Sequence, residues 1–199
     1  AFIVCDNARE SLEASCNASG SQGSPANWKI DETQEHELQC WAEAKGVWIP
    51  NSEQMLCQSF GDKIAEGAEA KVYYKTGDTH VVKLRTSIYA TLGRGLEAIA
   101  LHNALFPETI MRIVGFTRDD DELFRIILTQ PYIECQRLAS KEEIDNMVVS
   151  KGFQDNGDGK GINYISDHLH LEDMHPANVF IEPNTGLPVC IDCIVKFRR

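Results

Sequence analysis

The most informative stretch of the sequence is LEDMHPANVFI, residues 171–181, where Asp173 and Asn178 stand five positions apart just before an apolar run. Asp192 follows within the apolar stretch VCIDCIV. Oxygen ligands so close together suit Mg²⁺ that bridges phosphates, and Asp173 can orient or deprotonate an attacking hydroxyl group. A polar loop without a ligand is the alternative, but it leaves the charge of Asp192 among apolar residues, where an unpaired charge is costly. The pattern therefore favours chemistry at a phosphate.

Three residues further upstream could serve the same chemistry. Gly67, in EGAEAKV, lets the backbone approach a phosphate closely, although a single glycine is also typical of an ordinary hairpin turn. Lys83, in HVVKLR, faces the opposite way from Val82 and Leu84. Its ammonium group needs an anionic partner if that face is the inner one, and a solvent-facing lysine on an edge strand is the alternative. Glu97 either reaches Lys83 from its predicted helix or is a solvated helix residue.

Taken in the order in which they occur along the chain, the sequence motifs resemble those of the protein-kinase-like superfamily. The motifs that carry this resemblance are GAEAKVY, VVKL, GLEAIALH, DMHPAN and CIDC. The sequence is similar in particular to the small Ser/Thr/Tyr kinase-like domain of polyvalent proteins from bacterial mobile elements and phages, through EGAEAKVYY, LTQPYI, and DMHPANV followed by IDCIV. The resemblance extends from about Trp41 to Phe197. The His-Pro-x-Asn pattern, and an Asp that no Gly follows, also resemble aminoglycoside and choline kinases.

The resemblance implies a role for each matching residue, with ATP and Mg²⁺ as cofactors. Lys83 would contact the α- and β-phosphates, with Glu97 as its ion-pair partner and Gly67 in the loop over the phosphates. Asp173 would be the catalytic base. The remaining implied roles are Mg²⁺ binding by Asn178 and Asp192, and adenine binding by a hinge that contains Gln130, Tyr132 and Ile133.

The sequence departs from the kinase pattern at three points. Leu171 stands where kinases have a His two places before the catalytic Asp, and His170 is one place off. Cys193 and Ile194 follow Asp192 in place of Phe-Gly. Only seven residues come after Asp192, so we expect no long activation segment or peptide-binding platform in this chain.

Hydrophobic periodicity predicts the elements that position these residues. Short apolar runs from Phe60 onward, with Gly77-Asp78 as a hairpin signal, predict strands, and residues 90–105 have helical spacing. MRIVGFTR and ELFRIILTQ read as two strands joined by the acidic turn Asp119–Asp121. The pattern therefore predicts a sheet of about five antiparallel strands with one inserted helix.

The C-terminal part of the sequence has weaker signals. Ser140 and Glu143 form a capping-box pattern that opens a helix over residues 140–151. The loop FQDNGDGKG is interpreted as a flexible hairpin turn because glycines occupy the alternating positions that calcium ligands need. Strands are predicted around NVFIE and across LPVCIDCIV. On one strand, residues three positions apart diverge, so Cys190 and Cys193 are interpreted as two buried thiols and not as a redox pair.

Composition limits the classes of function. The chain has 199 residues, 43% of them hydrophobic, a net charge of −11 and seven cysteines. This length suits one domain or two small lobes. The acidic balance argues against a nucleic-acid partner, and no apolar run is long enough for a membrane helix. The odd cysteine count favours free thiols in the cytoplasm. The first residue is Ala, which suggests a trimmed N-terminus.

Together these features predict an α+β, minimal two-lobed kinase-like fold. We expect a helical extension and linker over residues 1–58, an N-lobe over 59–130 and a small C-lobe over 131–199. The expected function is ATP- and Mg²⁺-dependent phosphoryl transfer to a hydroxyl group of a protein. The alternatives are a nucleotide-binding or interaction module without transfer activity, in the manner of a pseudokinase, and a small-molecule kinase.

Overall fold

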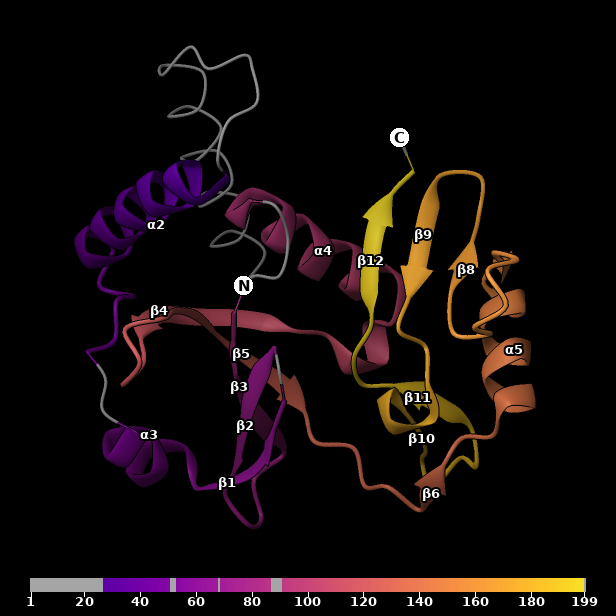
Figure 1. Ribbon diagram of the computed structural model, residues 1–199. Helices are drawn as coiled ribbons and strands as arrows, with labels where there is room; N and C mark the ends of the chain where they lie inside the picture. Colours follow the sequence, from indigo (N-terminus) through magenta and orange to yellow (C-terminus); the bar gives the residue numbers. More distant parts are fainter. Residues whose placement is uncertain (1–26, 51–52, 68, 87–90, 199) are drawn as a thin grey trace. The chain divides into compact units, whose positions relative to one another are not determined.

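The computed structural model describes residues 27–50, 53–67, 69–86 and 91–198 (Figure 1). The linker, and any helix, predicted within the first 26 residues lie outside this part. The chain divides into two compact units. The first contains residues up to Leu96 together with Met111–Gln130, and the second contains Glu97–Ile110 and Pro131–Arg199.

Helices and strands alternate along the chain, as expected for an α+β protein. The α-helices are α2 (Asn27–Ala44), α3 (Glu53–Phe60), α4 (Leu92–Leu105) and α5 (Lys141–Ser150), with short 3₁₀ helices η1 (Pro107–Thr109) and η2 (Pro176–Asn178). The strands are β1 (Asp62–Glu66), β2 (Ala70–Tyr74), β3 (His80–Arg85), β4 (Arg112–Arg118), β5 (Phe124–Pro131), β6 (Arg137–Leu138), β7 (Gln154–Asp155), β8 (Tyr164–Ile165), β9 (Leu169–Glu172), β10 (Val179–Ile181), β11 (Pro188–Cys190) and β12 (Ile194–Phe197). No helix in the described ranges combines the length and apolar character that crossing a membrane requires.

The first unit is built on a five-stranded sheet, as predicted from the sequence. Its strands lie in the order β1-β2-β3-β5-β4 (Figure 1). The β2–β3 hairpin turns at Gly77, whose φ of +91° is favourable only for glycine. The β4–β5 hairpin turns at Asp119, whose carboxylate accepts hydrogen bonds from the backbone amides of Asp121 and Leu123. Side-chain caps of this kind stabilise tight turns.

The segment after α2 covers the outer edge of this sheet. Trp48 pairs in parallel with Phe116 of β4, and the amide of Ile49 donates to the Phe116 carbonyl at 2.9 Å. Gly115 permits the close approach, because a Cβ atom there would lie 2.7 Å from the Val47 carbonyl oxygen. The predicted N-terminal extension therefore contributes directly to the sheet.

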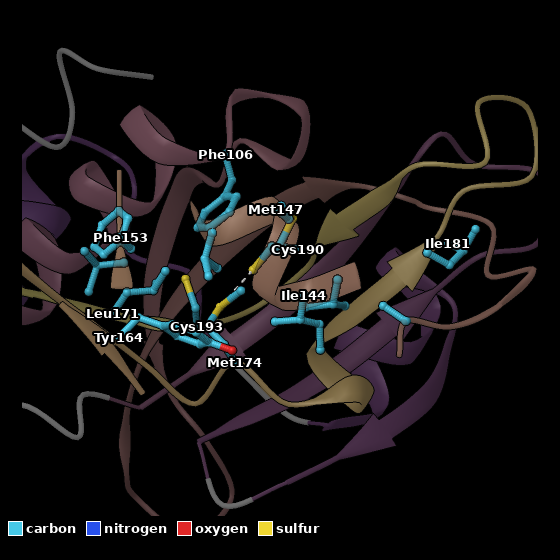
Figure 2. Close-up of a cluster of buried hydrophobic side chains, with 14 residues drawn as sticks. Phe106, Ile144, Met147, Phe153, Tyr164, Leu171, Met174, Ile181, Cys190 and Cys193 are labelled. Carbon is cyan, nitrogen blue, oxygen red and sulfur yellow. Dashed lines mark hydrogen bonds between the residues drawn. The ribbon is translucent and has the colours of Figure 1, made fainter. Parts of the chain in front are cut away.

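The second unit contains two small sheets and α5 around one apolar core. The sheets have the strand orders β11-β10-β6 and β12-β9-β8-β7. Figure 2 shows core side chains that come from both sheets, from α5 and from the segment after α4. The predicted capping box of α5 is present, with the Ser140 hydroxyl and the Glu143 carboxylate each bonded to the other residue's backbone amide. Residues 154–165 form a hairpin of β7 and β8, as predicted.

The structure corrects the prediction of one continuous strand over LPVCIDCIV. β11 ends at Cys190 and β12 begins at Ile194, and the two strands belong to different sheets. The Ile191 amide still donates to the Asn178 carbonyl, but the Cys193 amide donates to the Asp192 carboxylate. This local bond ends the ladder, a competition that is typical of Asp. Cys190 and Cys193 are nevertheless both buried, free thiols, as predicted.

Candidate functional site

The backbone of Asp173 has an unusual conformation directly after β9. Its φ is +65°, in the left-handed region that residues other than glycine seldom adopt and that Asp tolerates better than most. The Asp173 amide donates to Asn163 Oδ1 at 3.2 Å, and the Met174 amide donates to the Ile162 carbonyl at 2.9 Å. Leu171 and Met174, on either side, are fully buried. Such a conformation persists where the surroundings hold it, and it is common at functional sites.

The side chain of Asn178 holds Asp173 from the following 3₁₀ helix. Its Nδ2 donates to the Asp173 carbonyl oxygen and to Asp173 Oδ2, both at 3.0 Å. An amide nitrogen cannot coordinate a cation, so the other end of the side chain, Oδ1, is the atom suited to a metal ion. The spacing of five residues thus brings the carboxylate and the amide into direct contact.

His175 belongs to the same cluster, although sequence reasoning assigned it no role. Its Nε2 lies 3.2 Å from Asn178 Nδ2 and 3.5 Å from Asp173 Oδ1. A ring with Nε2 unprotonated accepts from Asn178, whereas a ring protonated at Nε2 donates to Asp173. The only signal in the sequence was the position of the His-Pro pair between Asp173 and Asn178.

Asp192 is brought beside Asn178 by the β10–β11 hairpin. Val179 pairs with Cys190, and the Ile191 amide donates to the Asn178 carbonyl at 2.9 Å. Asp192 is therefore the next residue after the one bonded to Asn178. Its Oδ1 accepts from the Cys193 amide at 3.0 Å, and it is half-buried in the link between two strands. The predicted position inside a strand is wrong, but its proximity to Asn178 follows from the hairpin.

A buried polar network supports the Asp192 segment from within the second unit. His102 of α4 is 2% exposed, and its Nδ1 lies 3.3 Å from the Cys193 thiol. The hydroxyl group of Thr109, also buried, donates to the Cys190 carbonyl at 2.6 Å. The Cys190 thiol donates to the Asp192 carbonyl at 3.2 Å. Both residues that flank the Ile191–Asp192 link are therefore fixed to the unit's interior.

The donor atoms at this site fit a hard cation. Asn178 Oδ1 and the Asp192 carboxylate supply oxygen atoms, the kind of ligand that Mg²⁺ prefers, and Mg²⁺ commonly binds through one or two such groups with phosphate and water completing its shell. Within the described ranges no group of three or more His, Cys, Asp or Glu side chains is arranged to hold a metal ion. A closed site of the zinc type is thus absent from this part of the chain.

Lys83 lies in the first unit, on a strand with neighbours on both sides. It is 6% exposed and pairs with Val72 across β2 and β3. Val82 and Leu84 face the other way, into a cluster that α3 covers. The alternative of a solvent-facing lysine on an edge strand is therefore wrong. Arg85 shares the face of Lys83, and its Nη2 lies 3.2 Å from the Glu69 carboxylate next to the glycine loop.

The other predicted residues of the nucleotide site are distributed over both units. Gly67 directly follows β1; a Cβ atom there would meet nothing within 4 Å, and its amide donates to the Ala70 carbonyl. Glu97 is half-buried on α4, at the start of the second unit. The chain passes between units after Gln130, which is buried, and continues into exposed Tyr132 and half-buried Ile133. The Lys83–Glu97 ion pair and the hinge contacts remain predictions.

Packing in the core accounts for Leu171 at the position where kinases have a His two places before the catalytic Asp. Alternation along β9 directs Leu171 into the core, where it is fully buried beside Tyr164 and Val195. His170 is on the opposite face, across from Lys196 of β12. A leucine at position 171 therefore serves packing beneath Asp173, and His170 faces away from that core.

An apolar row on the β6–β10–β11 sheet was not predicted. Phe180 pairs with Leu138 on one side and with Val189 on the other, so these three side chains share a face. Val179 and Ile181 point the opposite way, into the core. Leu138 is exposed and Phe180 is half-buried. Two residues after Asn178, the sheet thus presents an apolar face that is partly exposed, at Leu138 and Phe180, while Val189 is buried.

Comparison with known protein families agrees with this geometry. Residues 31–199 match the family described as serine/threonine/tyrosine kinases found in polyvalent proteins. The match begins within α2 and therefore includes part of the segment predicted as an extension. No curated protein matches the chain.

Proposed function

The chain belongs to the serine/threonine/tyrosine kinases found in polyvalent proteins, and we propose that it transfers the γ-phosphoryl group of ATP to a hydroxyl group of a protein. The family supports phosphoryl transfer to a hydroxyl group. The observation that carries the proposal is the bond from Asn178 Nδ2 to Asp173, because it holds the carboxylate of the proposed base directly beside the amide of a proposed Mg²⁺ ligand.

In the proposed reaction Asp173 acts on the acceptor. Its side chain is 41% exposed, so an incoming hydroxyl group can reach the carboxylate. Asp173 orients this hydroxyl group and takes its proton as the new oxygen–phosphorus bond forms and the bond to the β-phosphate oxygen breaks. Asn178 fixes the carboxylate through Oδ2 and the carbonyl oxygen. This restraint favours catalysis by positioning.

Asn178 and Asp192 would hold Mg²⁺, which neutralises phosphate charge when bound. The residues themselves need to present oxygen atoms in a fixed arrangement, and the β10–β11 pairing supports this. Lys83 would contact the α- and β-phosphates, with Glu97 as its partner. Gly67 would lie over the phosphates, and the hinge from Gln130 to Ile133 would contact adenine. The apolar side chains of Phe180 and Leu138 are chemically suited to contact with the face of a base.

Incubation with labelled ATP and Mg²⁺ tests the proposal. The acceptors are the chain itself, a mixture of Ser-, Thr- and Tyr-containing peptides, and a panel of small alcohols. We expect label on protein hydroxyl groups, and Asp173→Ala should reduce the rate by about 10²- to 10⁴-fold, the usual contribution of a general base. Asp167→Ala, an exposed Asp between β8 and β9, is the matched control and should leave the rate unchanged.

The possible outcomes separate the candidate functions. Equal, negligible transfer by wild type and Asp173→Ala, with ATP still bound, would mean a nucleotide-binding module without transfer activity. Label on small alcohols alone would mean a small-molecule kinase. Either result would overturn a protein acceptor.

A further inference from the structure

The side chain of Asn163, in the hairpin loop between β7 and β8, bonds to the backbone of Asp173. The Asn163 Oδ1 atom accepts the Asp173 amide at 3.2 Å, and Asn163 Nδ2 donates to Asp158 Oδ2 at 2.6 Å. A carboxylate oxygen only accepts and a backbone amide only donates, so these two partners fix which end of the Asn163 amide faces each of them. The side chain has one orientation that satisfies both bonds.

Asp158 is itself held by the loop. Its carboxylate accepts from the Lys160 amide at 2.8 Å and from Asn156 Nδ2 at 3.1 Å. Hydrogen bonds from Asn163 and the Lys160 amide, in that order of effect, hold the pKa of the Asp158 carboxyl below its usual value. The group therefore remains an ionised acceptor at neutral pH, which maintains the orientation of Asn163.

The base of the loop is attached to helix α5. Tyr164, the residue after Asn163, is buried, and its hydroxyl group donates to Asp145 Oδ1 at 2.7 Å. Lys141 Nζ lies 3.1 Å from the same hydroxyl group and 5.3 Å from the centre of the ring. Asn163 thus extends from a fixed point toward Asp173.

We propose that Asn163 is a positioning residue for Asp173, oriented by Asp158, and that the β7–β8 loop thereby sets the geometry of phosphoryl transfer. The effect of Asn163 on the rate of phosphoryl transfer rests on the proposed function, whereas the hydrogen bond from the Asp173 amide to Asn163 does not. Residues 162 and 163 support the left-handed backbone of Asp173 with two hydrogen bonds, one on each side of the residue. The acceptor of one is the Ile162 carbonyl, which bonds the Met174 amide, and the acceptor of the other is the side chain of Asn163. Only the second can be removed by substitution.

The test compares Asn163→Ala with Asn156→Ala. Both substitutions remove an amide that donates to Asp158 in the same loop, but only Asn163 reaches Asp173. We expect Asn163→Ala to reduce kcat by roughly 10- to 100-fold, the scale of a small misplacement of a reacting group, with KM for ATP unchanged. Asn156→Ala should retain wild-type kcat. A purely structural role of Asn163 in the loop would instead alter stability to a similar degree in both variants and spare kcat.

A second variant tests the orientation of the bond. Asn163→Asp alone places a second carboxylate next to Asp158, and we expect it to be impaired. Asn163→Asp combined with Asp158→Asn exchanges the two groups: an amide at position 158 donates to a carboxylate at position 163, which still accepts the Asp173 amide. The double variant should recover most of the kcat lost in Asn163→Asp. Failure of the exchange to recover activity in a folded protein would contradict the proposal.

Amide hydrogen exchange at Asp173 provides a readout that needs no activity. In wild type and Asn156→Ala the Asp173 amide should exchange slowly, and in Asn163→Ala it should exchange at least about tenfold faster, since its acceptor is gone. Equal exchange rates in the two single variants would overturn the proposal. Absence of phosphoryl transfer in the wild type, with this difference in exchange still present, would reject the proposed function and leave the restraint on Asp173 established.

Discussion

His102 and Cys193 are 91 residues apart in the sequence, yet the imidazole Nδ1 lies 3.3 Å from the thiol inside the second unit. His102 belongs to α4, and Cys193 directly follows Asp192. The opposite ring nitrogen, Nε2, lies 3.3 Å from the carbonyl and hydroxyl oxygens of Thr109. The helix and the candidate metal ligand are therefore linked by a buried chain of polar contacts, and a disturbance of this chain should reach Asp192.

The first prediction concerns Thr109. Thr109→Val keeps the shape of the side chain but leaves the Cys190 carbonyl oxygen without the hydroxyl group that donates to it at 2.6 Å. Because that oxygen is buried, the free energy of unfolding should fall by about 1–3 kcal/mol. Urea denaturation measures the change. The same substitution at exposed Thr76 should change the free energy of unfolding by less than about 0.5 kcal/mol, and an equal loss at both positions would contradict the role of the Thr109 hydroxyl group.

Asp192 gives a prediction that separates folding from metal binding. Asp192→Asn keeps an oxygen that can accept the Cys193 amide, so the unfolding temperature without ligand should remain near that of the wild type. The affinity for Mg²⁺ with ATP should fall by at least about 10- to 100-fold, since even residues behind metal ligands contribute that much. Thermal shift with ATP, with and without Mg²⁺, measures both. Full Mg²⁺-dependent stabilisation of the variant would remove Asp192 from the site, and Asp167→Asn is the control.

Gly67 allows a test of the phosphate loop in which stability does not interfere. An added Cβ atom meets nothing within 4 Å in the described structure, and its φ lies outside the left-handed region. Gly67→Ala should therefore keep or slightly raise stability, but weaken ATP binding about tenfold, or about 1.4 kcal/mol, if a phosphate approaches the backbone there. Titration calorimetry measures the affinity. Gly93→Ala, a glycine with similar space, should bind ATP normally; unchanged affinity in Gly67→Ala would remove this loop from the phosphate site.

Asp119 carries a prediction for pH. It is buried and accepts from Arg125 Nε at 2.8 Å, with Lys71 Nζ 3.6 Å away. Burial raises the pKa of its carboxyl, but hydrogen bonds from Arg125 and the Leu123 amide, with both positive charges, lower it overall. Because the folded-state pKa is the lower one, this stabilisation is present above the unfolded-state pKa of about 3.9 and is lost as pH falls through the folded-state value.

Asp119→Ala should accordingly destabilise the protein at pH 7 by about 3–5 kcal/mol, because buried Arg125 and half-buried Lys71 lose their counter-ion. The difference between variant and wild type should shrink as the pH is lowered toward 3. Asp121→Ala, which removes an exposed carboxylate from the same turn, should have little effect at either pH. Urea denaturation at pH 7 and pH 3 measures both differences, and a pH-independent difference would contradict the proposed ion pairs.

The sequence was most informative where the interacting residues are close together or alternate regularly. Asp173 and Asn178 are five residues apart, and Lys83 faces away from Val82 and Leu84 because strand residues alternate. The capping box of α5 was visible for the same reason. Local spacing and period were sufficient in these cases.

Long-range polar contacts and an aperiodic strand break were not predictable. The run LPVCIDCIV is apolar apart from Asp192 and rich in β-branched residues, so no period marks the point where the chain leaves β11 for β12. Asn163 and His102 acquire their partners only when distant segments meet. An Asn in a glycine-rich loop or a His in an apolar helix has no feature that would identify its partner.

The pairing of Trp48 with Phe116 bears on how the protein can be shortened for laboratory work. A fragment that begins at residue 59 would lack the segment that pairs with the edge strand β4. The backbone N–H and C=O groups of that strand would then be free to pair with neighbouring molecules. Such a fragment should aggregate at concentrations at which the longer chain remains monodisperse. The shortest fragment suited to purification therefore also retains α2, whose Leu38 and Ala42 are buried and whose Trp41 packs against Phe116.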